Sequence, residues 1–226
     1  MFQFIYKGRF DCIITKDIFE QHVKNLYNDI KKKFNITMDP KKFIVTMEID
    51  SKKSKGYGGY TDYDRKTEII YYLNLQLFGY PKKEQTFELI QGFFGIMLTH
   101  EMFHFFLPSV KNNSCWSEGV TDFMTFWYMD AIEENLLRLQ NEYKEIKDPK
   151  YKEHKYGYIT GFKKMVKLYN EDKTVIDTMK MIIKDFNKNL ETKQKKYTSS
   201  DIISYDKNFK TFFTGKCNNH IAHELN

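Results

Sequence analysis

Hydrophobic and polar positions follow two different patterns, and the change comes about a third of the way along the chain. In the first third, the runs at 43–49 and 68–73 are rich in β-branched and aromatic residues and are bounded by turn-forming residues. Before them, apolar residues recur at three- and four-residue intervals from Lys16 to Phe34. We therefore expect strands in this part of the chain and one amphipathic helix packed on their sheet.

A hairpin is predicted just before the pattern changes. The glycine-rich stretch 55–60 leads into Thr61–Tyr63, and the run Glu68–Leu73 follows a turn-forming sequence at 64–66. Two short β-rich runs separated by a polar turn are typical of antiparallel strands.

Helical spacing dominates from Lys83 onward. We expect an apolar helix up to Pro108, a second helix from about Ser117 to Glu145, and further helices at 154–169 and 174–186. A charged loop is expected at 147–152 and a solvated stretch at 188–196. One or two short helices are expected within 206–224. Strands followed by helices predict the α+β class. We expect one domain over 1–226, with a strand-rich part at 1–80 and a helical part at 81–226.

Composition fits a folded domain. The chain has 226 residues, of which 41% are hydrophobic, 17% aromatic and 29% charged, which predicts a soluble protein with an ample core. The formal charge of +6 is best explained by a solvated lysine-rich surface. No nucleic-acid-binding motif accompanies it, so no nucleic-acid partner is expected, and the oligomeric state stays open.

The cysteines and the apolar runs bear on location. Cys12, Cys115 and Cys217 are odd in number and form no close pair, which disfavours a disulfide framework or a cysteine-based zinc site. No apolar run reaches the roughly 20 residues that span a bilayer, and residues 1–6 are too short for a signal-peptide core. These features predict an intracellular protein without a membrane segment.

The sequence His-Glu-Met-Phe-His at positions 100 to 104 is the strongest chemical signal. Residues four apart on a helix lie on one face, so His100 and His104 can bind one metal ion. Glu101, which follows the first histidine, can take a proton from an attacking water and later give it to a leaving amine.

A third ligand is expected in the sequence Trp-Ser-Glu-Gly-Val-Thr-Asp at 116–122. Glu118 can bind the metal, while Asp122, one helical turn later, can accept the free ring N–H of a ligand histidine. Three nitrogen and oxygen ligands with one open position suit catalytic zinc, so one Zn²⁺ per chain is predicted. The alternative is that both histidines are incidental, that Glu118 favours the helix dipole, and that Asp122 is a surface carboxylate.

These residues resemble those of the gluzincin metallopeptidases, most closely the catalytic domains of the aminopeptidase N and glycyl aminopeptidase families. The matching positions are His100, Glu101, His104, Trp116, Glu118 and Gly119. The resemblance implies a zincin-like domain that cleaves peptide bonds, with a peptide or protein as its substrate.

Two further features enter through this resemblance. Those families carry a catalytic tyrosine in a Tyr-x-x-Gly stretch, which Tyr158 and Gly161 match, so Tyr158 would donate to the oxyanion. Tyr156 is the alternative donor. The hairpin that ends in Glu68–Leu73 resembles the edge strand that pairs with extended substrates in this clan.

The chain also departs from the family pattern. The Gly-x-Met-Glu-Asn motif that anchors a substrate amino group in the aminopeptidase N family is absent, so strict aminopeptidase specificity is not implied. Three alternatives stay open: hydrolysis of a non-peptide substrate, a non-catalytic zinc-binding or partner-binding domain, and a second metal tract at Cys217, His220 and His223. An intact Glu101 favours catalysis, because a purely structural zinc site needs no base.

Overall fold

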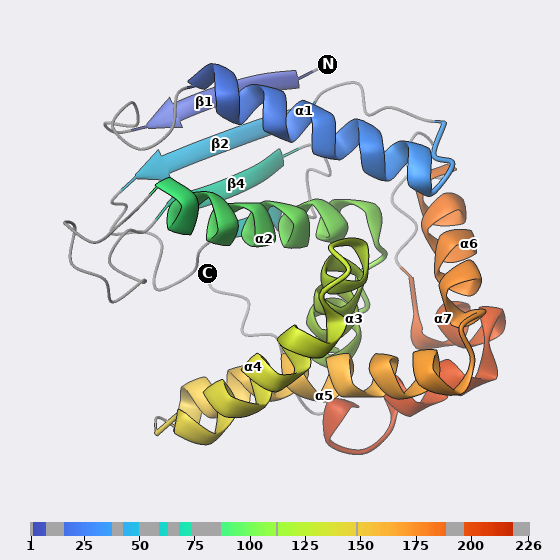
Figure 1. Cartoon of the computed structure of the whole chain (residues 1–226). Coiled ribbons are helices and arrows are strands. Elements are labelled where there is room, and N and C mark those ends of the chain that lie inside the picture. The colour runs from blue at the N-terminus through green and yellow to red at the C-terminus, as the bar shows by residue number, and fades with distance from the viewer. Residues whose placement is uncertain are drawn as a thin grey trace. The chain divides into compact units, whose positions relative to one another are not determined.

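A computed structural model of the chain describes residues 2–7, 16–37, 43–49, 59–62, 68–73, 87–111, 113–147, 149–188 and 197–218 (Figure 1). The chain divides into two compact units, the first formed by 1–106 with 190–192 and the second by 107–189 with 193–226. The expected single domain over 1–226 stays a prediction.

The first unit contains a four-stranded mixed sheet. Its strands are β1 (Phe2–Lys7), β2 (Phe43–Ile49), β3 (Gly59–Asp62) and β4 (Glu68–Leu73), in the order β1-β2-β4-β3. β1, β2 and β4 run parallel, whereas β3 is antiparallel to β4. The predicted strands at 43–49 and 68–73 and the α+β class are confirmed. The predicted hairpin is confirmed by the β3–β4 pair, although its turn lies outside the described residues.

In the predicted hairpin, the strand that lies at the sheet edge is β3, and the inner strand is β4. β4 pairs with β2 on one side and β3 on the other, which leaves Gly59–Asp62 at that edge. Five of the six β4 residues are apolar or aromatic, a composition typical of a strand with neighbours on both sides. β1 was not predicted, because its run of six residues has no clear turn signal at its start.

Helix α1 (Lys16–Lys33) packs on this sheet as predicted. Its buried residues recur at helical spacing and are Phe19, Val23, Leu26, Tyr27 and Ile30. The Phe19 ring lies 6.0 Å from Phe4 of β1, and the Tyr27 ring lies 5.2 Å from Phe43 of β2. Tyr27 also lies 5.4 Å from Phe106, at the end of α2 (Phe87–Phe106). Aromatic side chains therefore pack between the sheet, α1 and the C-terminal end of α2.

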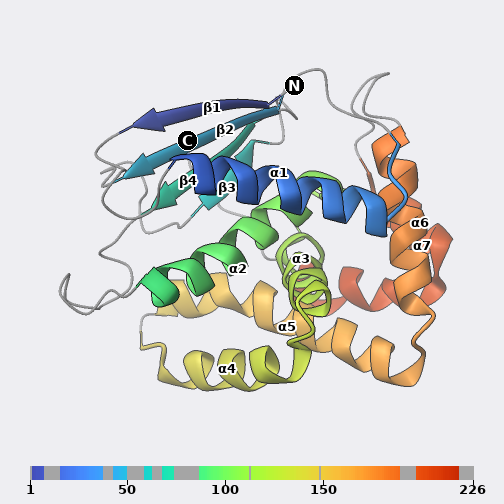
Figure 2. The same ribbon diagram turned by 45° about the horizontal axis from the view of Figure 1, so that its top comes forward.

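The second unit is helical. Its elements are α3 (Ser114–Tyr128), α4 (Ile132–Glu145), α5 (Pro149–Glu171), α6 (Val175–Lys188), α7 (Ser199–Tyr205) and the 3₁₀ helices η1 (Lys207–Phe213) and η2 (Gly215–Asn218). The long helix predicted up to Glu145 is interrupted at Met129–Ala131, where Asp130 adopts a positive φ of 55°. α4 and α5 then lie side by side (Figure 2).

One local prediction in this unit is wrong and one helix was missed, and helix capping explains both. Residues 149–152 of the loop expected at 147–152 form the start of α5, because proline is well tolerated at the first position of a helix and Pro149 occupies it. α7 was not predicted, yet Thr198 and Asp201 form a reciprocal capping box at its start. The predicted solvated stretch 188–196 lies outside the described residues after Lys188, and so do His220 and His223.

A disulfide joins Cys115 and Cys217, which corrects the expectation that the cysteines stay unpaired. The two residues are 102 positions apart in sequence but have Cα atoms 5.6 Å apart, so only the folded chain reveals the pair. Disulfides persist mainly in oxidising compartments. The cysteines therefore no longer support the intracellular location that was predicted.

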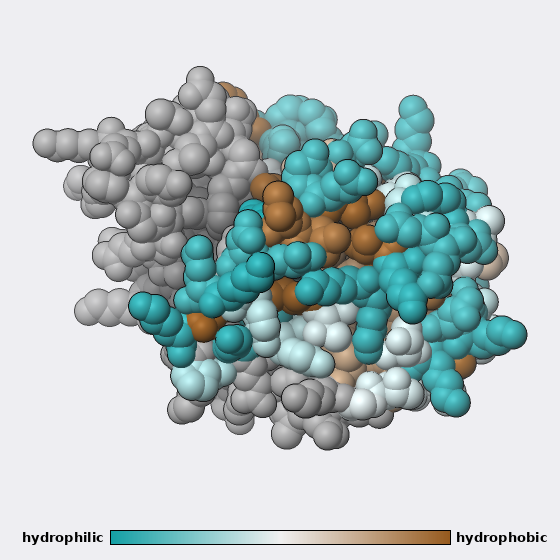
Figure 3. Space-filling view, turned by 60° about the horizontal axis from the view of Figure 1, so that its bottom comes forward, coloured by the Kyte–Doolittle hydropathy of each residue, from teal (hydrophilic) through white to brown (hydrophobic). Residues whose placement is uncertain are grey.

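The surface shows both polar and apolar areas. On the face drawn in Figure 3, hydrophilic side chains surround a central area of apolar surface. Large apolar side chains that are individually exposed include Ile18, Met129, Leu137 and Met181. Among the described residues, no helix combines the length and apolar character needed to cross a membrane.

Candidate metal centre

Helix α2 carries His100 and His104 one turn apart, as predicted. Their ring centroids are 4.5 Å apart and their planes are at 85°. The C-terminal part of α2 is buried on several sides, because Leu98, Met102, Phe103, Phe105 and Phe106 are all buried. The histidine pair therefore sits on a rigid and largely apolar helix.

Two polar side chains of this helix are buried among those apolar residues. Glu101 is 7% exposed and His104 is 6% exposed, and each has an interaction partner. Burying such groups costs free energy unless partners compensate it, so their presence here is not the pattern of an ordinary surface helix. A buried His104 is also what an incidental histidine packed in the core would show, so burial alone does not decide between a metal ligand and an incidental histidine.

The start of α3 differs by three residues from the prediction. The helix begins at Ser114, and the Asn113 side chain caps it by accepting a hydrogen bond from the Trp116 N–H at 2.8 Å. Glu118 therefore lies in the second turn of α3. Since helix-dipole effects fall off within the first turn, stabilisation of the dipole is a poor explanation for Glu118.

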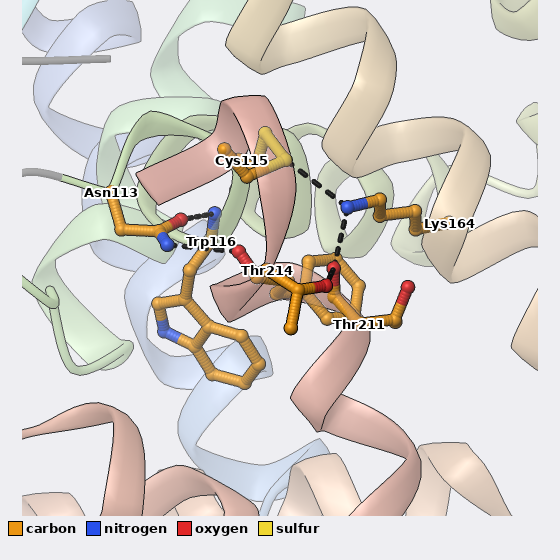
Figure 4. The surroundings of a disulfide bond; sticks show 8 residues. Asn113, Cys115, Trp116, Lys164, Thr211 and Thr214 are labelled. Atoms are coloured by element: carbon orange, nitrogen blue, oxygen red, sulfur yellow. Dashed lines mark hydrogen bonds between the residues drawn. A yellow bond between two sulfur atoms is a disulfide. The ribbon is translucent and has the colours of Figure 1, made fainter. Parts of the chain in front are cut away.

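Several contacts fix the segment just before Glu118. The Trp116 indole N–H donates to the Pro108 carbonyl at 2.9 Å, and the Asn113 amide donates to the Phe212 carbonyl at 2.9 Å. The buried Trp116 ring packs against Phe209, Phe212 and Phe213 of η1. The disulfide at Cys115 adds a covalent link to the same C-terminal segment (Figure 4).

His100, His104 and Glu118 come together in the structure. Each offers one ligand atom, and these atoms lie within 4.8 Å of one another. Ligand atoms of one tetrahedral zinc ion lie about 3.4 Å apart, given metal–ligand bonds of about 2.1 Å. The three donors therefore form a group that could hold a metal ion, and two nitrogens with one oxygen are a donor set that zinc accepts.

Asp122 lies one turn after Glu118 and is 8% exposed, so it is not the surface carboxylate of the alternative interpretation. It takes part in interactions of its own. Its hydrogen bond to a ligand histidine stays a prediction.

Two glycines that accompany the site residues in sequence lie where α3 crosses α5. A Cβ atom added to Gly119 would overlap the backbone of Gly161 and Phe162, and one added to Gly161 would overlap the backbone of Cys115 and Gly119. Backbones can approach this closely only where side chains are missing. At this crossing, the part of α3 that contains Glu118 packs closely against the part of α5 that contains Tyr158.

The two candidate tyrosines, Tyr156 and Tyr158, differ in their position on α5 relative to this crossing. Gly157 and Gly161 mark the side of α5 that faces α3, since a Cβ on Gly157 would overlap Ser114. With about 100° per residue, Tyr158 lies about 80° from the middle of that side and Tyr156 about 120° from it in the opposite direction. Tyr156 instead lines a cavity between α4 and α5. Tyr158 is therefore nearer than Tyr156 to the side of α5 that faces α3, and the choice of oxyanion donor stays a prediction.

Asn113 and the Cys115–Cys217 disulfide also support the site, and neither was predicted. The capping role of Asn113 had a local signal, because asparagine is a preferred residue immediately before a helix. The disulfide had no local sequence signal, because its two cysteines are 102 positions apart.

Comparison of the chain with protein-family models, with curated proteins and with solved structures finds no match.

Proposed function

We propose that this protein is a zinc-dependent hydrolase with a zincin-like arrangement, and that it cleaves peptide bonds. The grouping of the His100, His104 and Glu118 ligand atoms within 4.8 Å is the observation that carries the proposal. Such a grouping needs residues that are 18 positions apart in sequence to converge, which chance placement on separate helices rarely produces.

Zinc, when bound, polarises a carbonyl group and makes water a usable nucleophile near neutral pH. Glu101 is the base in this proposal, because it follows a ligand histidine directly and is nearly buried. It accepts the proton of the attacking water and passes it to the leaving amine. Tyr158 donates its phenolic O–H to the carbonyl oxygen as negative charge develops there.

The choice of a peptide as substrate rests on the resemblance of positions 100–104 and 116–119 to the gluzincins. Metal and fold alone do not determine a substrate, so a peptide library is the appropriate first assay. Cleavage of a library by the zinc-loaded protein would support the peptidase proposal. Failure to cleave any peptide while zinc binds would direct attention to non-peptide substrates.

The first expected result concerns metal content. Wild-type protein should hold about one zinc ion per chain, and His104→Ala should lose most of it, because two remaining ligands bind zinc far more weakly than three. Elemental analysis after dialysis measures this directly. His22→Ala is the matched control, since His22 lies on α1 and outside the ligand group. Equal zinc in wild type and His104→Ala would refute the ligand assignment.

The second expected result concerns the oxyanion donor. Tyr158→Phe keeps the aromatic ring but removes one hydrogen bond made mainly in the transition state, so kcat should fall about 10²–10³-fold with little change in KM. Tyr156→Phe is the control and should stay active. If Tyr156→Phe is the impaired variant, the donor is Tyr156. If both stay active, neither tyrosine has this role.

A further inference from the structure

A cavity lies in the helical unit, and none of the three candidate metal ligands lines it. It has a volume of about 390 Å³ and is formed by Tyr143 of α4 and by six residues of α5, which are Tyr156, Ile159, Thr160, Lys163, Lys164 and Lys167. Sites for small organic molecules fall in the range of about 300–1,000 Å³. This cavity is therefore large enough for a small ligand.

The walls combine an apolar surface with positive charge. Two tyrosine rings and the buried Ile159 provide flat and aliphatic contact area, while the Tyr156 and Thr160 hydroxyl groups can donate hydrogen bonds. Among the described residues, those that line the cavity include three lysines and no carboxylate. A ligand that matches both properties has an apolar body and an anionic head.

Lys164 contributes mainly its aliphatic stem. Its Nζ donates to the Thr211 carbonyl at 2.5 Å and lies 3.1 Å from the Cys217 sulfur, as Figure 4 shows. Burial also lowers the pKa of its ammonium group. Its charged end is therefore engaged at the disulfide, away from an incoming ligand.

Lys163 and Lys167 are the cationic ends that remain for a ligand. They are four residues apart on α5, so their ammonium groups lie on the same face, where like charges repel and destabilise the helix. Lys167 has only a long contact of 3.7 Å to the exposed Glu171, and Lys163 has no ion pair among the described residues. One anion placed between them would relieve the repulsion of both.

We propose that the cavity between α4 and α5 binds a small amphipathic anion, whose carboxylate or phosphate head lies between Lys163 and Lys167 and whose apolar body contacts Tyr143, Tyr156 and Ile159. The proposal is independent of the zinc site.

Isothermal titration of the full chain with four probes tests this proposal. Octanoate and octyl phosphate carry both properties, octanamide keeps the apolar body without the charge, and inorganic phosphate keeps the charge without the body. At least one octyl anion should bind once per chain and at least 10-fold more tightly than octanamide and inorganic phosphate. The preferred head group distinguishes a carboxylate from a phosphate ligand.

Two double variants locate the binding. Lys163→Gln with Lys167→Gln should weaken the octyl anion at least 10-fold, whereas Lys180→Gln with Lys184→Gln, which removes the same charge at the same spacing on α6, should leave it unchanged. The proposal is overturned if neither octyl anion binds, if octanamide or inorganic phosphate binds equally well, or if the two double variants behave alike. Circular dichroism of each variant verifies that the fold is retained.

Discussion

Glu101→Gln should lower peptide hydrolysis by a factor of about 10²–10⁴ while zinc content and fold stay the same. Glutamine has nearly the shape of glutamate and keeps its ability to hydrogen-bond, but its neutral amide cannot accept the proton of an attacking water. Because Glu101 is not one of the three grouped ligand residues, the loss should appear in turnover alone. Parallel assays of turnover, zinc content and thermal unfolding measure this separation.

Glu134→Gln is the matched control, because Glu134 is an exposed residue of α4 and the substitution makes the same change of charge. It should behave as wild type. If Glu101→Gln retained full turnover, the proposed role of Glu101 as the base would be wrong even if zinc binding were demonstrated. Loss of zinc in this variant would instead mean that Glu101 supports the metal.

Gly161→Ala should destabilise the protein by about 3 kcal/mol, although alanine favours helices more than glycine does. The added Cβ would overlap the Cys115 carbonyl oxygen and the Gly119 Cα, both of which are backbone atoms that cannot move aside without separating α3 from α5. Urea unfolding, followed by far-UV circular dichroism, gives the change in free energy of unfolding.

Gly95→Ala provides the control within a helix. Among the described residues, a Cβ at Gly95 meets no atom within 4 Å outside its own helix backbone, so the change in helix propensity dominates, and stability should rise by about 0.5–1 kcal/mol. Opposite signs for the two variants would establish the tight crossing of α3 and α5. Equal effects would mean that the backbones at Gly119 and Gly161 are not in contact in solution.

Much of the fold could be predicted because its signals are local. The strand at 43–49 has the predicted bounds, since a β-rich run there is flanked by residues that break strands. The break at Met129–Ala131 could not be predicted, because no glycine or proline marks it and the amphipathic pattern continues into α4. The inner position of β4 in the sheet could not be predicted either, because strand order depends on pairing partners far away in sequence.

In the candidate site too, features with a local sequence signal could be predicted and features that depend on tertiary packing could not. The spacing of His100 and His104 alone implies that they share a face of α2, so that part of the site needed no tertiary information. Glu118 could be expected as the third ligand from its place one helical turn before Asp122 and from the resemblance, but which helix face approaches the histidines is decided by packing. The close crossing at Gly119 and Gly161 depends on atoms from two helices and has no signature in either helix alone.

The link between Cys115 and Cys217 also has a consequence for the order of events during synthesis. The ribosome must add another 102 residues after Cys115 before its partner exists, so a nascent chain can form α3 long before this support of its first turn is available. The packing of the Trp116 ring also requires this C-terminal segment, because its aromatic neighbours are Phe209, Phe212 and Phe213. The start of α3, which carries Glu118, is thus among the last parts of the helical unit to be secured.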